Sequence, residues 1–290
     1  MSFSYEEAFS RNLGWVTVDE QQVLRGKRVA IAGLGGTGGG QLLTLARLGI
    51  GKFHLADFDT FSLVNFNRQA GAMMSTLGKP KVEALSAMAR DINPELELRL
   101  FPEGVTPANV DSFFDGVDVY VDSLDYFAFD ARVLVHRKCA ERGIPAVIVA
   151  PLGMGAALIN FLPGGITFED YFQVNGVSDE ERALRFLVGL SPALLQRTYL
   201  VDASRVKLGD RAGPSTGMSC QLCAGVAATE VLKVLLERGK VYGAPWVVHF
   251  DAYRNRLAKT WRPGGNRHPL QRIALAIANA QLKRMKRAAV

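Results

Sequence analysis

The chain has 290 residues, of which 48% are hydrophobic and 21% charged, and a formal net charge of +6. This composition is typical of a globular protein, and we expect one main domain because single cores stop growing near ~250–300 residues. No apolar run approaches the roughly 20 residues of a membrane span, and the acidic start "MSFSYEEAFSRN" is unlike a signal peptide. We therefore expect a cytoplasmic protein with no membrane partner.

Short apolar runs alternate with helical patterns from residue 28 to about 153, which predicts an α/β fold with a Rossmann-like, doubly wound and mainly parallel sheet. The expected strands are Arg28–Gly33, Lys52–Asp57, Glu97–Phe101, Val117–Asp122 and Ala146–Pro151. The expected helices are Thr37–Leu48, Lys79–Ile92, Pro107–Phe114 and Phe127–Arg142. Glycines close the first and last of these helices, at positions 49 and 143, and a proline opens the helix at position 107.

The pattern changes after Pro151. "MGAALINFLPGG" predicts an antiparallel strand, Cys220–Leu236 an apolar helix, and "WVVHFDAYR" with "RLAKTWR" a hairpin that extends the sheet. We divide the chain into an N-terminal helical arm (1–27), a nucleotide-binding core (28–165), an insertion or crossover segment (166–213), a helix and hairpin that complete the core (214–262), and a basic C-terminal helix (263–290).

A glycine-rich loop, "GLGGTG", lies between the first expected strand and helix. Glycines permit positive φ and let backbone N–H groups approach a phosphate at the start of the helix. Alone, the loop fits NAD, FAD and ATP equally. The next strand ends in Asp57 and Asp59, where an acid can hold ribose hydroxyls. The loop glycines that we expect to contact a nucleotide are Gly33, Gly35, Gly36 and Gly38.

The stretch "NFNRQ", residues 65–69, favours ATP over NAD. The pyrophosphate of NAD already rests on the glycine loop, so an arginine flanked by amides has little use there. The β- and γ-phosphates of ATP extend beyond the loop, where a guanidinium can bind them in a bidentate way.

The motifs "GxGGxG", "DFDTFSLVNFNRQ" and "GKPKVEALSAMARDINP" together resemble the ThiF/MoeB/HesA superfamily, the bacterial relatives of ubiquitin-activating enzymes. The similarity covers about residues 5–165 and 214–262. It implies ATP and Mg²⁺ as cofactors and adenylation of a carboxylate. By this resemblance Asp59 holds the ribose, Asn65 and Arg68 face the phosphates with Gln69 beside them, and a lysine reaches the phosphates from the next helix. Lys81 fits that lysine better than Lys79.

The same resemblance assigns "VDSLDYF", residues 121–127, to the metal. It implies that Asp125 coordinates Mg²⁺ and that Asp122 supports it, although Tyr126 replaces the family's asparagine. The segment "FSRNL" resembles the family's N-terminal "SRQ", from which an arginine reaches the other subunit's ATP. Arg11 is therefore expected to act in trans, within a homodimer.

The cysteines and histidines depart from the zinc pattern of many relatives. Two CxxC pairs hold zinc in those proteins, but only Cys220 and Cys223 form such a pair here, so we expect no structural zinc. Packing of a buried helix is the simpler interpretation of both thiols, and of Cys139, although either thiol of the pair could carry an activated product. The four histidines show no clustered spacing.

These patterns predict an ATP-dependent adenylyltransferase of the ThiF type. The expected acceptor is the C-terminal glycine of a ubiquitin-like sulfur-carrier protein. The alternative is the carboxylate of threonylcarbamoyladenosine in tRNA, because relatives that cyclise it share "N-x-N-R-Q" and a basic C-terminal tail. A peptide or an amino acid is a third acceptor. An NAD-dependent oxidoreductase and an inactive nucleotide-binding module also remain open, and the basic tail fits a solvated helix face as well as an anionic partner.

Overall fold

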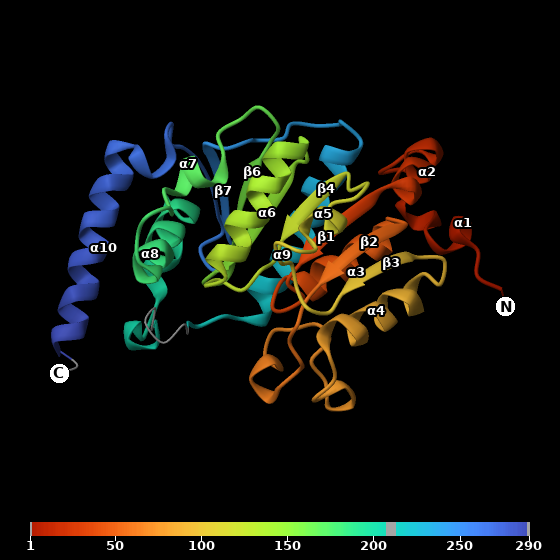
Figure 1. Cartoon of the computed structure of the whole chain (residues 1–290), viewed down its shortest axis with the longest axis horizontal. Coiled ribbons are helices and arrows are strands. Elements are labelled where there is room, and N and C mark those ends of the chain that lie inside the picture. The colour runs from red at the N-terminus through yellow and green to blue at the C-terminus, as the bar shows by residue number, and fades with distance from the viewer. Residues whose placement is uncertain (1, 207–212, 289–290) are drawn as a thin grey trace.

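An eight-stranded mixed sheet forms the centre of the computed structural model, which describes residues 2–206 and 213–288 (Figure 1). The strand order is β3-β2-β1-β4-β5-β6-β7-β8. The strands are β1 (Arg28–Ala32), β2 (Lys52–Ala56), β3 (Glu97–Phe101), β4 (Val119–Asp122), β5 (Ala146–Leu152), β6 (Gly155–Phe161), β7 (Trp246–Asp251) and β8 (Arg256–Trp261).

The first five strands pair in parallel and the last three join them antiparallel. This arrangement confirms the predicted doubly wound sheet with its antiparallel extension. Ala32 at the end of β1 pairs with Ala56 of β2 and with Asp122 of β4. The carboxyl ends of these three strands therefore meet at one edge, which is where ligands bind in open α/β sheets.

Helices cover both faces of the sheet, as Figure 1 shows. Alternate residues of β1 separate the two cores, because Ile31 packs in one and Ala30 in the other. One face carries α3 (Gly38–Leu48), α4 (Lys81–Ile92) and α9 (Gly217–Leu235), and the other α5 (Val110–Phe113), α6 (Phe129–Arg142), α7 (Phe168–Phe172) and α8 (Asp179–Leu190). The remaining helices are α1 (Tyr5–Ala8), α2 (Val18–Gly26) and α10 (Pro269–Ala288).

All four helices predicted between residues 37 and 142 begin later than expected, at Gly38, Lys81, Val110 and Phe129 rather than at Thr37, Lys79, Pro107 and Phe127. Pro107 does not open α5, which begins at Val110, because the side-chain Oδ1 of Asn109 accepts the backbone N–H of Thr106 and makes a turn first. α4 begins at Lys81 because Pro80 is extended. The two predicted closing glycines, at 49 and 143, are confirmed: both are left-handed and follow α3 and α6.

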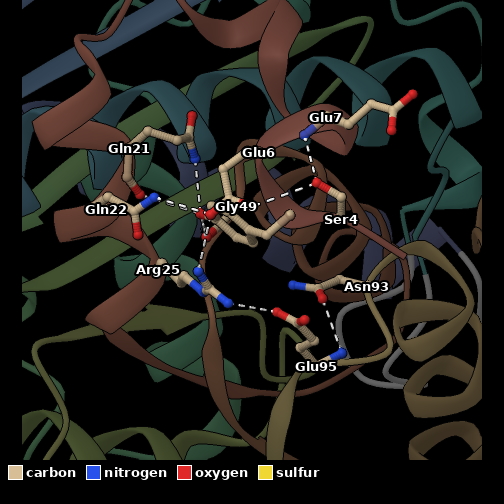
Figure 2. Close-up of polar contacts among 10 residues, drawn as sticks. Ser4, Glu6, Glu7, Gln21, Gln22, Arg25, Gly49, Asn93 and Glu95 are labelled. Atoms are coloured by element: carbon tan, nitrogen blue, oxygen red, sulfur yellow. Dashed lines mark hydrogen bonds and ion pairs between the residues drawn. The ribbon is translucent and has the colours of Figure 1, made fainter. Parts of the chain in front are cut away.

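The N-terminal arm is fastened to the far end of α3 by polar contacts (Figure 2). The Tyr5 hydroxyl donates to the Gly49 carbonyl over 2.5 Å. Arg25 of α2 pairs with Glu6, at 3.4 Å, and with Glu95, at 2.8 Å. Because the glycine loop precedes α3 and the arm packs where α3 ends, the arm lies at the opposite end of this helix from the loop of its own subunit.

α9 corrects one expectation from the sequence. By length and composition alone, this 19-residue helix is apolar enough to cross a membrane, and no other helix of residues 2–206 and 213–288 passes the same test. It packs against α3 and against β5 and β6. Half of its apolar stretch is buried in the core of this fold.

Candidate functional site

The glycine loop uses two of its glycines to pass closely over neighbouring backbone. Gly33 has φ +85°, and a Cβ there would overlap the carbonyl of Ser123. A Cβ at Gly38 would overlap the carbonyl of Gly33. Gly35 and Gly36 are different, because a Cβ on them would meet only side chains, the nearest being Gln69 Nε2 at 3.5 Å and Cys220 Sγ at 3.3 Å.

The start of α3 has the properties of an anion site. Thr37 occupies the N-cap position, but its side chain makes no capping hydrogen bond. The first backbone N–H groups of an α-helix have no partner within the helix, and the helix dipole places partial positive charge there. A phosphate at this point would satisfy groups that no side chain satisfies.

The two acids after β2 have separate roles. The Asp57 carboxylate binds backbone groups: it accepts hydrogen bonds from the N–H groups of Leu34, at 2.6 Å, and Asp59, at 2.8 Å. Burial raises the pKa of Asp57, and these two hydrogen bonds oppose the rise. Asp57 therefore ties the glycine loop to the end of β2, while the Asp59 side chain remains 55% exposed and is the acid available to a ribose.

Lys81 and Lys79 are clearly distinguished by the structure. The Lys81 side chain is 6% exposed, and its Nζ donates to Asp59 Oδ2 over 2.8 Å. Lys79 is exposed, two residues before α4 begins. An ammonium group has three donors, so Lys81 keeps two for a ligand beside Asp59. This position supports the prediction that Lys81 is the phosphate lysine.

The segment 65–69 brings its side chains to the glycine loop. Arg68 lies about 3.8 Å from the position of a Cβ on Gly36. Its Nη1 donates to the carbonyl of Val64 and to Asn67 Oδ1, which orients the guanidinium. Asn67 in turn donates to Ser215 at 2.9 Å, across 148 residues of sequence. Sequence reasoning did not assign this buttressing role to Asn67.

The two predicted amide residues differ in what they have left to offer. Asn65 is buried and its Oδ1 accepts from the N–H of Ser62, so part of its amide shapes the loop. Gln69 is also buried, and its Oε1 has no hydrogen-bond partner among the described residues. The amide nitrogen of Gln69 is the atom that lies beside the glycine loop, 3.5 Å from the position of a Cβ on Gly35.

Asp122 is a positioning residue. Its Oδ2 accepts from Arg132 Nε and from His136 Nε2, each at 2.9 Å. Burial works against the charged carboxylate, but the Arg132 guanidinium and His136 outweigh it and keep the pKa of Asp122 below its usual value. Arg132 Nη2 also donates to the carbonyls of Leu124 and Asp125, at 2.8 and 3.0 Å. The pair thus fixes the loop that carries Asp125.

Asp125 itself is exposed, and its Oδ1 accepts the N–H of Phe127 at 2.9 Å. Within residues 2–206 and 213–288 no group of three His, Cys, Asp or Glu side chains could hold a metal. Mg²⁺ does not require such a group, because it usually binds one or two carboxylates together with waters and substrate phosphates. The single free carboxylate oxygen of Asp125 fits that mode.

Three further predicted features lie in different surroundings. Arg11 is exposed on the N-terminal arm, away from the glycine loop of its own subunit. Cys223 and Cys139 are packed in the two cores, as expected. Cys220 is buried beside Gly36 and Arg68, a position that its sequence spacing did not reveal. Burial raises the pKa of this thiol, although Ser215 and Arg68 oppose the rise.

The residues at this edge fit the triphosphate of a nucleotide. Arg68 supplies a cation beside Gly36, and Lys81 supplies a second one beside Asp59. Asp59 adds an exposed carboxylate, which fits ribose hydroxyls rather than phosphate. No nucleophile paired with a general base is required for chemistry that such a site performs on phosphate.

The fold and this site define a doubly wound α/β protein with a phosphate-binding type of glycine loop at the carboxyl edge of its sheet. The chain belongs to the ThiF family, which matches residues 9–272. This family consists of ATP-using, adenylyltransferase-like enzymes. The match confirms the resemblance found in the motifs.

Individual relatives place the chain within that family. It is 35% identical over 150 residues to tRNA threonylcarbamoyladenosine dehydratase of Bacillus subtilis, a match covering 51% of this chain and 57% of the relative. The chain therefore spans little more than half of that relative's length. Two Escherichia coli structures share the fold. MccB with ATP has a TM-score of 0.64 and 19% sequence identity, and the match covers 90% of this chain and 74% of MccB. The E. coli tRNA N6-threonylcarbamoyladenosine dehydratase with AMP has a TM-score of 0.60 and 22% identity, and the match covers 81% of this chain and 97% of the dehydratase.

Proposed function

We propose that this protein uses ATP to adenylate a carboxylate. The observation that carries the proposal is Arg68 beside Gly36 of the glycine loop, together with the buried Lys81 held on Asp59 after the next strand. In this reaction a carboxylate oxygen attacks the α-phosphorus of ATP, the bond to the β-phosphate oxygen breaks, and pyrophosphate leaves. A carboxylate is already ionised at neutral pH, so the enzyme needs to position two anions and stabilise the leaving group.

Each residue has a defined task in this proposal. The N–H groups at the start of α3 bind the inner phosphates, Arg68 and Lys81 stabilise the charge that grows on pyrophosphate, and Asp59 binds the ribose. Asp125 would hold Mg²⁺, which supplies further charge stabilisation when bound. Asp122, through Arg132, keeps the Asp125 loop in place.

For the acceptor, we favour a threonylcarbamoyladenosine carboxylate in tRNA over the glycine of a sulfur carrier. The support comes from the dehydratase relative, which is 35% identical over 150 residues, and from the basic C-terminal segment. After adenylation, an internal nucleophile of the same nucleoside attacks the activated carbonyl, AMP leaves, and a ring forms. The net change in the nucleoside is the loss of one water.

The experiment compares acceptors under the same conditions. Full-length protein and Mg-ATP are incubated with tRNA that contains threonylcarbamoyladenosine, and with a small carrier protein that ends in Gly-Gly. Mass spectrometry of the digested tRNA should show the nucleoside minus one water, with AMP and pyrophosphate formed in equal amounts. Pyrophosphate release that depends on the carrier protein alone would refute the tRNA acceptor and restore the sulfur-carrier alternative.

A further inference from the structure

A second candidate site lies where α8 and α10 meet the 3-10 turn Gly265–Arg267. The cavity there measures about 590 Å³, and no residue of the glycine loop lines it. Three arginines line it but only one acid, Glu181. The arginines are Arg185, Arg267 and Arg272.

The walls of this cavity are fastened by buried side chains. Gln271 of α10 is 1% exposed and donates to the Val188 carbonyl of α8 over 3.0 Å. Asn266 is 4% exposed, and its Nδ2 donates to the carbonyls of Phe172 and Arg185, at 2.8 and 2.9 Å. Both donors of the amide are thereby directed into the protein, and Oδ1 has no partner among the residues that the structure describes.

The arginines retain unused donors. Arg185 is oriented by Glu181, at 2.8 Å from its Nε, and by the Gln173 carbonyl, which accepts from Nη1. Arg267 makes a 3.4 Å surface contact with Asp170. The exposed Arg272 side chain makes no hydrogen bond or ion pair with the described part of the chain. A rigid guanidinium flanked by two freer ones matches the bidentate geometry of phosphate recognition.

Charge is strongly segregated toward this end of the molecule. Ten of the 34 Lys and Arg residues lie in residues 252–290, which contain none of the 28 Asp and Glu, so this segment is +10 and the rest of the chain is −4. α10 stands at one end of the long axis, opposite the N-terminal arm (Figure 1). A one-sided basic region of this kind attracts polyanions over several ångströms, and its affinity for them falls as the salt concentration rises.

We propose that this cavity binds the ribose-phosphate backbone of RNA. The arginines fit phosphate oxygens, and the amides of Gln173 and Asn279 in the lining fit ribose hydroxyls, which DNA lacks at the 2′ position. The shape and charge of the cavity favour a phosphodiester ligand. The identification of the RNA as tRNA rests on the proposed function. The cavity would bind part of the tRNA backbone while the modified nucleoside reaches the glycine loop.

The test uses full-length protein and an unmodified tRNA transcript, so that binding is measured without chemistry. Fluorescence anisotropy over a series of salt concentrations should give a Kd for the wild type that weakens steeply with salt. The double variant R267A/R272A should bind about tenfold or more weakly. The slope of log affinity against log salt concentration should fall by about the contribution of two phosphate contacts. R90A removes an exposed charge from α4, outside the basic segment, and should bind as the wild type does.

The outcomes separate this inference from the proposed function. If R267A/R272A binds tRNA as tightly as R90A, the cavity is not the RNA site, whatever the protein catalyses. If the loss occurs but modified tRNA is never dehydrated, the RNA site stands and the proposed function fails. Competition by polyglutamate as strong as that by tRNA would show that the cavity recognises acidic protein, and would overturn the assignment. Equal unfolding temperatures of the variants establish that the fold is intact.

Discussion

Lys81 Nζ lies 2.8 Å from Asp59 Oδ2, so the lysine assigned to phosphate and the acid assigned to ribose contact each other directly. The Lys81 side chain is buried and that of Asp59 is 55% exposed. The pair places an ammonium group at the edge of the candidate nucleotide site and leaves Asp59 Oδ1 free of it. The sequence favours Lys81 over Lys79 as the phosphate lysine, and the burial of Lys81 beside Asp59 supports that prediction.

Replacement of Lys81 tests this assignment. Lys81→Met keeps the length of the side chain but removes its charge, and we expect affinity for ATP to fall about 10- to 100-fold because a charged hydrogen bond contributes roughly 1.5–3 kcal/mol. Lys79→Met, two residues away and exposed, is the control and should leave affinity unchanged. Isothermal titration with Mg-ATP measures both. A larger loss in the Lys79 variant would reverse the assignment.

We expect the reaction to require the guanidinium group of Arg68 and not only a positive charge at this position. Arg68→Ala should lower the rate of ATP–pyrophosphate exchange at least tenfold, and Arg68→Lys should restore only part of it, because an ammonium cannot bind two phosphate oxygens in a fork. Arg47→Ala, on the opposite end of α3, is the control. Binding of Mg-ATP to Arg68→Ala with wild-type affinity would remove this residue from the site.

The ion pair between Arg132 and Asp122 should matter for stability as well as activity. Both side chains are at most 3% exposed, so Arg132→Leu leaves a buried carboxylate without its cation and should lower the free energy of unfolding by roughly 3–5 kcal/mol. Arg137→Leu, on the same helix, breaks an exposed pair with Glu169 and should cost only about 0–1 kcal/mol. Urea denaturation compares the two. Equal losses would mean that the Asp122 pair contributes no more than a surface contact.

His249 predicts a dependence of stability on pH. It is 1% exposed, neither ring nitrogen has a partner among the described residues, and burial lowers its pKa. The unfolded chain therefore binds a proton at about pH 6.5, before the folded chain does, and stability should fall as pH drops through that value toward the lower folded pKa. His249→Asn should flatten the slope of unfolding free energy between about pH 7.5 and 5.5. Parallel curves for the two proteins would contradict this.

The predicted trans role of Arg11 can be tested by mixing inactive variants. The Arg11→Ala and Asp125→Ala variants should each lack ATP–pyrophosphate exchange activity when assayed alone as homodimers. If Arg11 serves the other subunit, a mixed dimer has one site with both wild-type residues, and mixing should restore activity to a fraction of the wild-type level. Absence of any recovery, with mixed dimers shown by native mass spectrometry, would place Arg11 outside the partner's site.

Local patterns were sufficient for the elements that build the site. The glycine loop, the apolar strand before it and the acids after β2 are encoded within a few residues, because strand periodicity and turn chemistry are local properties. The motif "NFNRQ" and the spacing of Lys81 likewise predicted family membership, which the ThiF match confirms. Helix starts were less accurate, as Pro107 shows, since a side-chain turn at Asn109 competes with the helix.

By itself, then, the sequence determined the doubly wound fold, the glycine loop between its first strand and helix, and membership of the ThiF family. Only the tertiary structure decided that Asp57 binds backbone while Asp59 stays exposed and pairs with Lys81, and that Asp122 is held by Arg132 and His136. In the sequence, the four-residue spacing of Arg132 and His136 on α6 indicated only that both lie on one face of this helix. The reason is physical: the role of a carboxylate depends on which partners reach it, and these partners come from other elements whose distance in space no local pattern specifies.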